Sequence, residues 1–227
     1  MELGKPIFRA RELTTRLVQR IRNPLNALQL NLDSLEEEIG SASAEKSLQR
    51  LNKIRKTIGE LDGLLCEVLR LVDSPRPQLT PVNINSLVSE VETFVRPESL
   101  RKDVAVKMEL AERLPDVPGD PVQLKQALLS VLLNAIQACP IEGSVTLATE
   151  ANNEHIIVKV IDNGEGISPS HRSRIFEPFF STKEGASGLG LPLALAIVKE
   201  HQGRISFTSA AGKGSTFLIS LPAKRKY

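Results

Sequence analysis

The segment Asp162-Asn163-Gly164-Glu165-Gly166-Ile167 combines a carboxylate with two closely spaced glycines, and it directly follows an alternating apolar run typical of a strand. Glycines allow the backbone to approach a ligand closely. A carboxylate at the edge of a sheet can accept a hydrogen bond from the amino group of a base. Taken alone, the same residues are also typical of a plain Asn-Gly turn.

A second glycine-rich segment, Gly185-Ala186-Ser187-Gly188-Leu189-Gly190-Leu191, leads into an apolar pattern of helical period that starts at Pro192. The free N–H groups and the positive dipole at the start of such a helix can hold a phosphate or another anion. The spacing is not that of a P-loop, because no Gly-Lys-Ser/Thr follows. It is not a dinucleotide fingerprint either, because the preceding strand is too distant. A flexible surface loop is the alternative interpretation.

Two further features are weaker by themselves. Asn134 lies on the apolar helical pattern from Pro121 to Ala138, and an amide there needs polar partners. Those partners are either other core groups or a hard cation such as Mg²⁺, held through the amide oxygen. The segment Gly212-Lys213-Gly214-Ser215-Thr216 precedes the last predicted strand and is typical of a hairpin turn.

The elements that position these residues follow from hydrophobic periodicity. Alternation predicts strands over Val104–Leu110, Val145–Thr149, Ile156–Ile161, Arg204–Ser209 and Thr216–Leu221. Helical period predicts helices over Ile84–Val95, Pro121–Ala138 and Leu193–His201. Helices interleaved with antiparallel, hairpin-like strands favour an α/β sandwich with the helices on one face of the sheet.

The first third of the chain is helical by period. One apolar stripe runs from Leu13 to Ile39 and a second from Leu48 to Val72, separated by Gly40-Ser41-Ala42-Ser43. Two long helices joined by a short turn form an antiparallel hairpin. A four-helix bundle made by two chains would bury both stripes. A monomeric hairpin docked on the rest of the chain is the alternative.

Composition excludes several classes of protein. The chain has 227 residues, is 41% hydrophobic and 25% charged, and has a net charge of +2. These values exclude wholesale disorder and a strongly basic nucleic-acid-coating protein, so no nucleic-acid partner is expected. Cys66 and Cys139 are too few for a disulfide framework. No apolar run reaches the roughly 18–20 residues that span a bilayer, and no secretion signal is recognisable. We therefore expect a cytoplasmic chain without a membrane segment.

In chain order the motifs are Asn134, Asp162-x-Gly-x-Gly, Phe176-Glu-Pro-Phe-Phe-Ser-Thr-Lys183, Gly188-Leu-Gly-Leu191 and Gly212-x-Gly-Ser-Thr. This order resembles the catalytic ATP-binding domain of sensor histidine kinases, in the wider gyrase, Hsp90, histidine kinase and MutL superfamily. The resemblance implies an α+β fold in three parts. They are a dimerisation and phosphoacceptor-like helical hairpin over residues 1–73, a Pro-containing linker over 74–77, and an ATP-binding α/β sandwich over 78–227.

The resemblance also implies roles for individual residues. Asn134 corresponds to the asparagine that holds Mg²⁺ on the triphosphate, and Asp162 to the aspartate that hydrogen-bonds the adenine amino group. The other residues assigned to ATP binding are Gly164, Gly166 and Ile167 along the base, Phe179 with Phe176 and Phe180 in an aromatic box beside the lid, Lys183 near phosphate, Gly188, Leu189, Gly190 and Leu191 in the lid loop, and Thr216 near the adenine. Ser130, four residues before Asn134, supplies no general base, so rapid hydrolysis of ATP by water is not expected.

The hairpin departs from the family at the phosphoacceptor motif, which reads His-Glu-hydrophobic-Arg/Lys-Asn-Pro-Leu. Here Gln19 stands at the position of the acceptor histidine and Arg20 at that of its acidic neighbour, while Asn23, Pro24 and Leu25 match the motif. A glutamine amide is not a nucleophile at phosphorus under these conditions, and a protonated guanidinium cannot act as a general base. We therefore expect no self-phosphorylation of the hairpin. Asn23 matches the position that orients water during dephosphorylation of a partner receiver domain.

The resemblance thus implies the ATP–Mg²⁺-binding core of a protein-histidine kinase in a two-component system. Three alternatives follow from Gln19: a pseudokinase scaffold, a regulator-binding or phosphatase module, and an acceptor-dead variant of an active kinase. The expected partners are a second copy of the chain and either a response-regulator receiver domain or another kinase. The chain is either a piece of a longer sensor or a stand-alone module.

Overall fold

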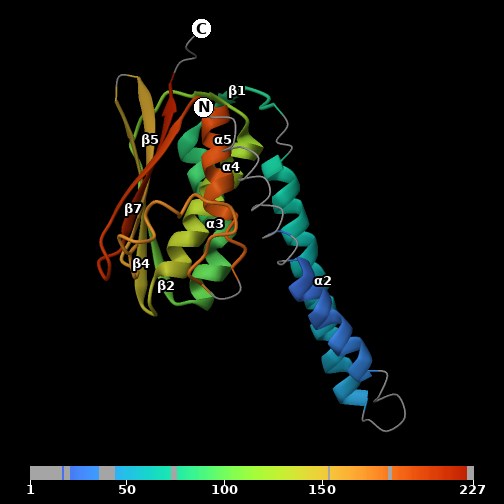
Figure 1. Ribbon diagram of the computed structural model, residues 1–227. Coiled ribbons are helices and arrows are strands. Elements are labelled where there is room, and N and C mark those ends of the chain that lie inside the picture. Colours follow the sequence, from blue (N-terminus) through green and yellow to red (C-terminus); the bar gives the residue numbers. More distant parts are fainter. Residues whose placement is uncertain are drawn as a thin grey trace, which may run out of the picture. The chain divides into compact units, whose positions relative to one another are not determined.

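The computed structural model describes residues 17, 21–35, 44–72, 76–152, 154–183 and 186–223. The chain divides into two compact units, Met1–Val72 and Asp73–Tyr227, which are described separately here (Figure 1). Gln19 and Arg20, on which the expectation about self-phosphorylation depends, lie outside the described residues. No helix in the described part of the chain is both long and apolar enough to cross a membrane.

The first unit contains helical residues 21–35 and helix α2 (Ala44–Val72). Ile54 of α2 is buried. Leu51, Ile58 and Leu65, spaced by seven residues, are 43%, 52% and 40% exposed. Apolar side chains at heptad spacing form the contact seam of coiled coils and helical bundles. The unit therefore presents an apolar stripe along α2 that the described residues do not cover.

The second unit is built on a mixed five-stranded sheet with strand order β2-β4-β5-β7-β6. Its strands are β2 (Val104–Glu109), β4 (Gly143–Ala151), β5 (His155–Asp162), β6 (Arg204–Ser209) and β7 (Ser215–Pro222). The β2–β4 pair is parallel, and the other three neighbouring pairs are antiparallel. A short antiparallel pair, β1 (Thr80–Val82) and β3 (Val117–Gly119), lies outside this sheet.

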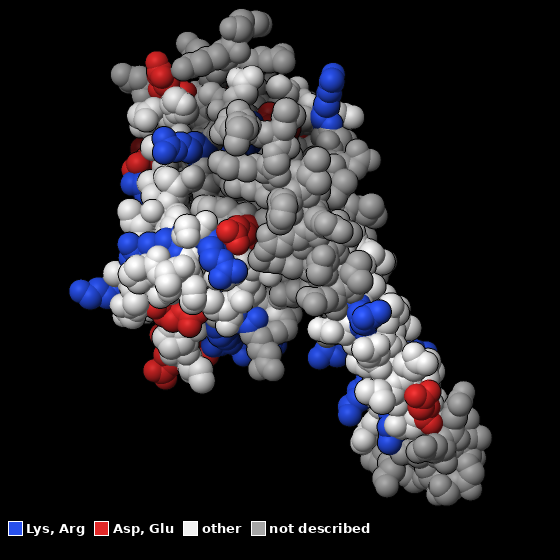
Figure 2. Space-filling model, in the orientation of Figure 1, with Lys and Arg blue, Asp and Glu red and all other residues white. Residues whose placement is uncertain are grey.

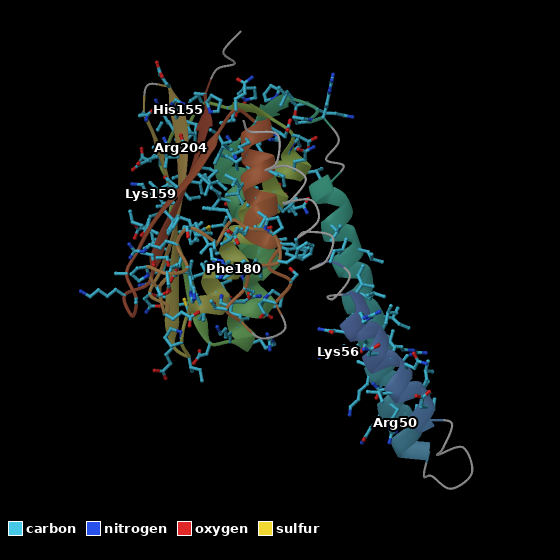
Figure 3. The ribbon with its side chains drawn as sticks, viewed as in Figure 1. Arg50, Lys56, His155, Lys159, Phe180 and Arg204 are labelled. Carbon is cyan, nitrogen blue, oxygen red and sulfur yellow. The ribbon has the colours of Figure 1, made fainter. Side chains whose placement is uncertain are left out.

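Three helices, α3 (Ile84–Arg101), α4 (Pro121–Ala138) and α5 (Gly190–Glu200), cover one face of the sheet (Figure 1). Alternation along the strands places Val145, Val158 and Phe217 in the core against these helices. His155, Lys159 and Arg204 lie on the side of the sheet away from the helices (Figure 3). This alternation explains why the five strands were recognisable as a half-covered sheet.

The predicted α+β class is correct, and the structure changes some details. The predicted bounds of α4 and β6 agree with the structure. Helix α3 was predicted to end at Val95, ahead of Pro97, but it continues to Arg101. A proline inside a helix removes one N–H donor, and buried packing of Val91, Val95 and Ser99 on both sides of it sustains the helix. The parallel β2–β4 pair and the short β1–β3 pair were not predicted.

Charges of both signs are interspersed on the face of the molecule drawn in Figure 2. Two ion pairs of the described residues join different elements, Lys125 with Glu90 (2.9 Å) and Lys159 with Glu150 (2.7 Å). Such exposed pairs contribute at most about 1 kcal/mol each. The described surface therefore matches a chain with a net charge close to zero.

Candidate functional site

Asp162 is the last residue of β5, and its side chain is buried. Its Oδ1 atom accepts hydrogen bonds from the backbone N–H groups of Gly164 (2.9 Å) and Ser215 (3.1 Å). The Oδ2 atom has no hydrogen-bond partner among the described residues. The carboxylate is therefore fixed through one oxygen and leaves the other as an acceptor for a ligand.

Burial raises the pKa of Asp162 above its ordinary value, and the two backbone donors and Lys183 only partly oppose this effect. A buried carboxylate without a cation bonded to it is costly to keep charged. Such a group is a candidate for a functional role, because stability alone would favour a neutral residue here.

Close backbone packing explains the glycines that follow Asp162. A Cβ atom on Gly164 would lie 2.4 Å from the carbonyl oxygen of Ala138, and one on Gly166, which has a φ of +67°, would lie 2.1 Å from that of Ala210. Glu165 donates its backbone N–H to Ala138 at 3.1 Å. The segment after β5 is thus pressed against the C-terminal end of α4, with no room for side chains at either glycine.

Three residues of helix α4, each one turn from the next, contact the other parts of the site. Ala138 contacts the segment after Asp162, and Asn134, one turn earlier, accepts a hydrogen bond through its backbone oxygen from Nζ of Lys183 (3.1 Å). One turn earlier again, Ser130 lies beside the N-terminus of α5, since a Cβ on Gly190 would be 3.7 Å from the Cβ of Ser130. Residues spaced by four follow one face of a helix, so this line extends over about 12 Å.

Helix α5 begins at Gly190 without a side-chain cap. The residue before it, Leu189, is buried and donates its N–H to the hydroxyl of Ser187 (3.3 Å). The second helical residue is Leu191, and Pro192 after it has no N–H. The N–H groups of the first turn therefore lack the side-chain oxygen that usually caps them, as expected of an anion-binding helix start.

The base of the lid loop is closed by a backbone hydrogen bond from Phe179 to the carbonyl of Gly188 (2.9 Å). Both residues have positive φ angles, +65° for Phe179 and +69° for Gly188. A Cβ on Gly188 would lie 2.7 Å from the carbonyl carbon of Phe179 and from the carbonyl oxygen of Phe180. Only glycine fits this closure, and Phe179 adopts a conformation that non-glycine residues rarely take.

The three phenylalanines of the predicted aromatic box have separate environments. Phe176 contacts Phe207 edge to face with 6.0 Å between ring centroids. The ring of Phe180, labelled in Figure 3, receives the guanidinium of Arg174 at 4.2 Å and the edge of His171 at 5.5 Å. Phe179 contributes mainly through the backbone closure already described. Phe176 therefore connects the segment before the lid to β6, whereas the contacts of Phe180 are with Arg174 and His171 of that same segment.

The other predicted residues lie near these elements. Ile167 donates its N–H to the hydroxyl of Ser209 (2.7 Å), which fixes the end of the Asp162 segment to β6. Thr216, on β7, is half-buried and pairs with Ile161, next to Asp162. Asn23, in the first unit, is helical and exposed.

Two lysines donate to backbone carbonyls of α4. Nζ of Lys102 caps its end through Ile136 (3.0 Å) and Gln137 (2.7 Å), which stabilises the negative end of the helix dipole. Nζ of Lys183 bonds Asn134, within the helix. Partial burial lowers the pKa of Lys183 below its ordinary value, although the charges of Glu165 and Asp162 raise it.

Some residues of the site could not be found from motifs. Ser215 holds Asp162 through a backbone N–H, and a Cβ on Gly214 (φ +81°) would lie 1.9 Å from the carbonyl oxygen of Asp162. The only sequence signal was the glycine-rich turn, which by itself indicates no more than a hairpin.

His201 is buried, donates through Nδ1 to the carbonyl of Ile197 (2.8 Å) and accepts from the N–H of Asp120 (2.9 Å), so its role is structural.

Among the described residues no group of three or more His, Cys, Asp and Glu side chains could form a metal site. An all-protein metal cage is therefore not part of the described site. A single amide oxygen such as that of Asn134 suits Mg²⁺, because this ion keeps several waters and is usually shared with substrate phosphates.

Comparison with known proteins shows which protein family the second unit resembles. Residues 119–225 match the family described as histidine kinase-, DNA gyrase B- and HSP90-like ATPase. The sensor histidine kinase ZraS of Salmonella typhi is 31% identical over 211 residues, which is 92% of this chain and 45% of ZraS. The crystal structure of full-length ShkA in complex with AMPPNP has a TM-score of 0.71 and 27% identity, covering 93% of this chain and 45% of ShkA.

The structure of histidine kinase ThkA in complex with the response regulator TrrA shares the fold, with a TM-score of 0.78 and 24% identity over 94% of this chain and 61% of that one. The fold and the match over residues 119–225 define an ATPase domain of the histidine kinase, gyrase and Hsp90 type. The relatives align over nearly the whole chain, and together with the domain match they support a sensor histidine kinase core. It spans less than half the length of ZraS.

Proposed function

We propose that the second unit binds ATP with Mg²⁺ along the half-buried line of α4 formed by Ser130, Asn134 and Ala138. The observation that carries this proposal is the spacing of three different binding groups at successive turns of that helix. The free oxygen of Asp162 lies at the Ala138 end, Asn134 lies in the middle, and the uncapped start of α5 lies at the Ser130 end. In this order the three groups match the adenine base, the Mg²⁺-bound phosphate chain and the terminal phosphates of ATP.

In this proposal Oδ2 of Asp162 accepts a hydrogen bond from the adenine amino group. The N–H groups of Gly190 and Leu191 bind phosphate oxygens at the positive end of α5. The side-chain oxygen of Asn134 would be a ligand of Mg²⁺, which would supply positive charge to the phosphates. The similarity to ShkA, whose structure is a complex with AMPPNP, supports an adenine nucleotide as the ligand.

We infer that the first unit is the dimerisation hairpin. The exposed heptad stripe of Leu51, Ile58 and Leu65 on α2 supports this role, because a second copy of the same stripe would cover it in a four-helix bundle. A response-regulator receiver domain is the proposed partner, and the similarity to ThkA in its complex with TrrA supports this class of partner.

The hairpin of this chain is proposed not to accept phosphate from ATP. Gln19 offers an amide where a histidine kinase needs an imidazole nitrogen, and Arg20 cannot take up a proton. Asn23 is exposed in its helix, so a water held by its amide would be accessible to a docked receiver domain. This observation favours a regulator-binding or phosphatase module as the second candidate function.

Calorimetric titration of the full chain tests the first proposal. We expect saturable binding of ATP in the presence of Mg²⁺, weaker binding when Mg²⁺ is chelated, and much weaker binding of GTP, whose oxygen faces Asp162 where adenine has an amino group. Absence of heat and of competition with a fluorescent ATP analogue at millimolar ATP would show that the site does not bind nucleotide.

A further inference from the structure

Asn163 and Gly164 form the only Asn-Gly pair in the chain, and Asn163 is exposed to water. Asparagine is a thermolabile residue, and a following glycine hinders its deamidation least, because glycine has no side chain. In this reaction the backbone nitrogen of the glycine attacks Cγ of the asparagine. Ammonia leaves, a five-membered succinimide forms, and water then opens the ring to give either aspartate or isoaspartate.

Hydrogen bonds of the folded chain hold both reacting groups. The N–H of Gly164 donates to Oδ1 of Asp162 (2.9 Å), and the amide oxygen of Asn163 accepts from the N–H of Ser144 (2.8 Å). The attack requires the nitrogen of Gly164 to lose its proton. A proton that is bonded to a carboxylate is hard to remove, because two negative charges would then face each other. The amide group that would be attacked is in addition tied to the start of β4.

The fold has room for only one of the two products. Isoaspartate carries the main chain through its side-chain carbon, so one CH₂ group is added between positions 163 and 164. Gly164 is buried, and a Cβ atom there would already lie 2.4 Å from the carbonyl oxygen of Ala138 and 2.9 Å from Oδ1 of Asp162. Aspartate leaves the main chain unchanged and keeps an oxygen that can accept from Ser144. Isoaspartate should therefore displace Gly164 from Asp162, whereas aspartate should preserve the turn.

We propose that Asn163 is a deamidation site that the hydrogen bond from Gly164 to Asp162 holds nearly inactive. Local opening of this segment sets the rate, because opening a short segment costs less free energy than unfolding the whole domain. Since ammonia has left, asparagine does not re-form, and each isoaspartate chain permanently loses the fixed position of the Asp162 carboxylate. Such a chain should also lose ATP binding; this last consequence alone rests on the proposed function.

The experiment incubates the full chain in H₂¹⁸O at mildly alkaline pH and measures, by mass spectrometry of proteolytic peptides, the ¹⁸O incorporated at residue 163. A synthetic peptide with the sequence of residues 158–169 gives the unprotected rate. A hydrogen bond to a charged acceptor corresponds to about 10- to 150-fold in an equilibrium. We therefore expect the folded chain to react at least about tenfold more slowly than the peptide, and equal rates would overturn the proposal.

Urea concentrations below the unfolding transition distinguish local opening from unfolding. The rate should hardly change over this range, because opening a short segment exposes little surface. If the logarithm of the rate instead rises in parallel with the unfolding equilibrium, the reaction takes place in the unfolded chain and the proposal fails. This measurement needs no variant.

Variants then test the hydrogen bond itself. Asp162→Ala removes the acceptor and should accelerate deamidation about tenfold, whereas Asp162→Asn keeps an acceptor oxygen and should accelerate it less than about threefold. The matched control for a general loss of stability is Asp120→Ala, which removes the N-cap of α4 and should leave the rate within about twofold of the unmodified chain. Equal acceleration by the two alanine variants, or none by Asp162→Ala, would overturn the proposal. If Asp162→Ala does not fold, the urea series decides.

The two products are compared through thermal unfolding. Asn163→Asp reproduces the aspartate product and should keep the midpoint of the unmodified chain, while a sample aged to isoaspartate should unfold at a lower temperature. Equal midpoints for the isoaspartate sample and the unmodified chain would refute the steric argument. If the unmodified chain does not bind ATP, the proposed function fails, but the deamidation rates still test this inference.

Discussion

Replacing Asp162 with asparagine separates its role in binding from its role in the fold. The amide oxygen of asparagine can keep the two hydrogen bonds that Oδ1 accepts from Gly164 and Ser215. The amide nitrogen then replaces Oδ2, so an acceptor becomes a donor facing the adenine amino group. The reverse orientation is disfavoured because it would set the NH₂ group against two backbone N–H donors.

The expected loss of ATP affinity follows from the hydrogen bond between the adenine amino group and Oδ2 of Asp162, which the substitution removes. A hydrogen bond to a charged group contributes about 1.5–3 kcal/mol, which corresponds to about 10- to 150-fold weaker binding of ATP. GTP should lose less, because the new amide can donate to the guanine oxygen, so the preference for ATP over GTP should narrow. Calorimetric titration of both nucleotides measures this directly.

Stability should not fall in the same variant. Burial raises the pKa of Asp162, so the native state binds more protons than the unfolded chain between the ordinary and the raised pKa, and stability falls as the pH rises through that window. A neutral amide avoids this cost, and the urea midpoint of Asp162→Asn at neutral pH should equal or exceed that of the unmodified chain. Asp116→Asn, at an exposed aspartate, is the control for the charge change. Equal ATP affinities in the two variants would refute the assignment of Asp162.

Three further predictions concern the framework. Asp120→Ala should lower the free energy of unfolding by about 1–2 kcal/mol, because Asp120 caps α4. Burial alone would raise the pKa of Asp120, but backbone donors hold that pKa below its ordinary value. In urea titrations the stability difference between the variant and the unmodified chain should therefore vanish as the pH falls through the lowered pKa. Gly188→Ala should cost about 1–3 kcal/mol, since its φ is +69° and the new Cβ would meet Phe179, whereas Gly190→Ala, with ordinary contacts, should lower thermal stability far less. Ile58→Asp should convert a dimer into monomers in light scattering without loss of ATP binding, and a monomeric unmodified chain would contradict the hairpin's role.

Much of the second unit could be predicted from periodicity. Helix α4 was predicted with its observed bounds from its apolar helical period. Its N-cap, Asp120, became evident only in the structure. Strand β6 alternates cleanly. Helix α3 was predicted to end at Val95, and only buried tertiary contacts, such as that of Ser99 beyond Pro97, show that it continues to Arg101.

The motif residues of the site are contiguous segments with unusual composition, which is why Asp162 and the glycines were recognisable. The groups that hold them are backbone atoms from distant segments. Ser215 reaches Asp162 because β5 and β7 pair in register across 53 positions of sequence, and no local pattern encodes that pairing. The bond from Lys183 to the carbonyl of Asn134 was equally invisible, because a backbone acceptor has no side-chain signature.

The central claim is that this histidine kinase core binds ATP but offers no acceptor on its hairpin. Incubation of the full chain with ATP labelled at the γ-phosphate and Mg²⁺, followed by mapping of acid-labile, base-stable label, tests it most directly, with the double variant Gln19→His and Arg20→Glu in parallel. The account predicts no such label on the unmodified chain and label on the double variant. Label of this kind on residues 8–73 of the unmodified chain would contradict it.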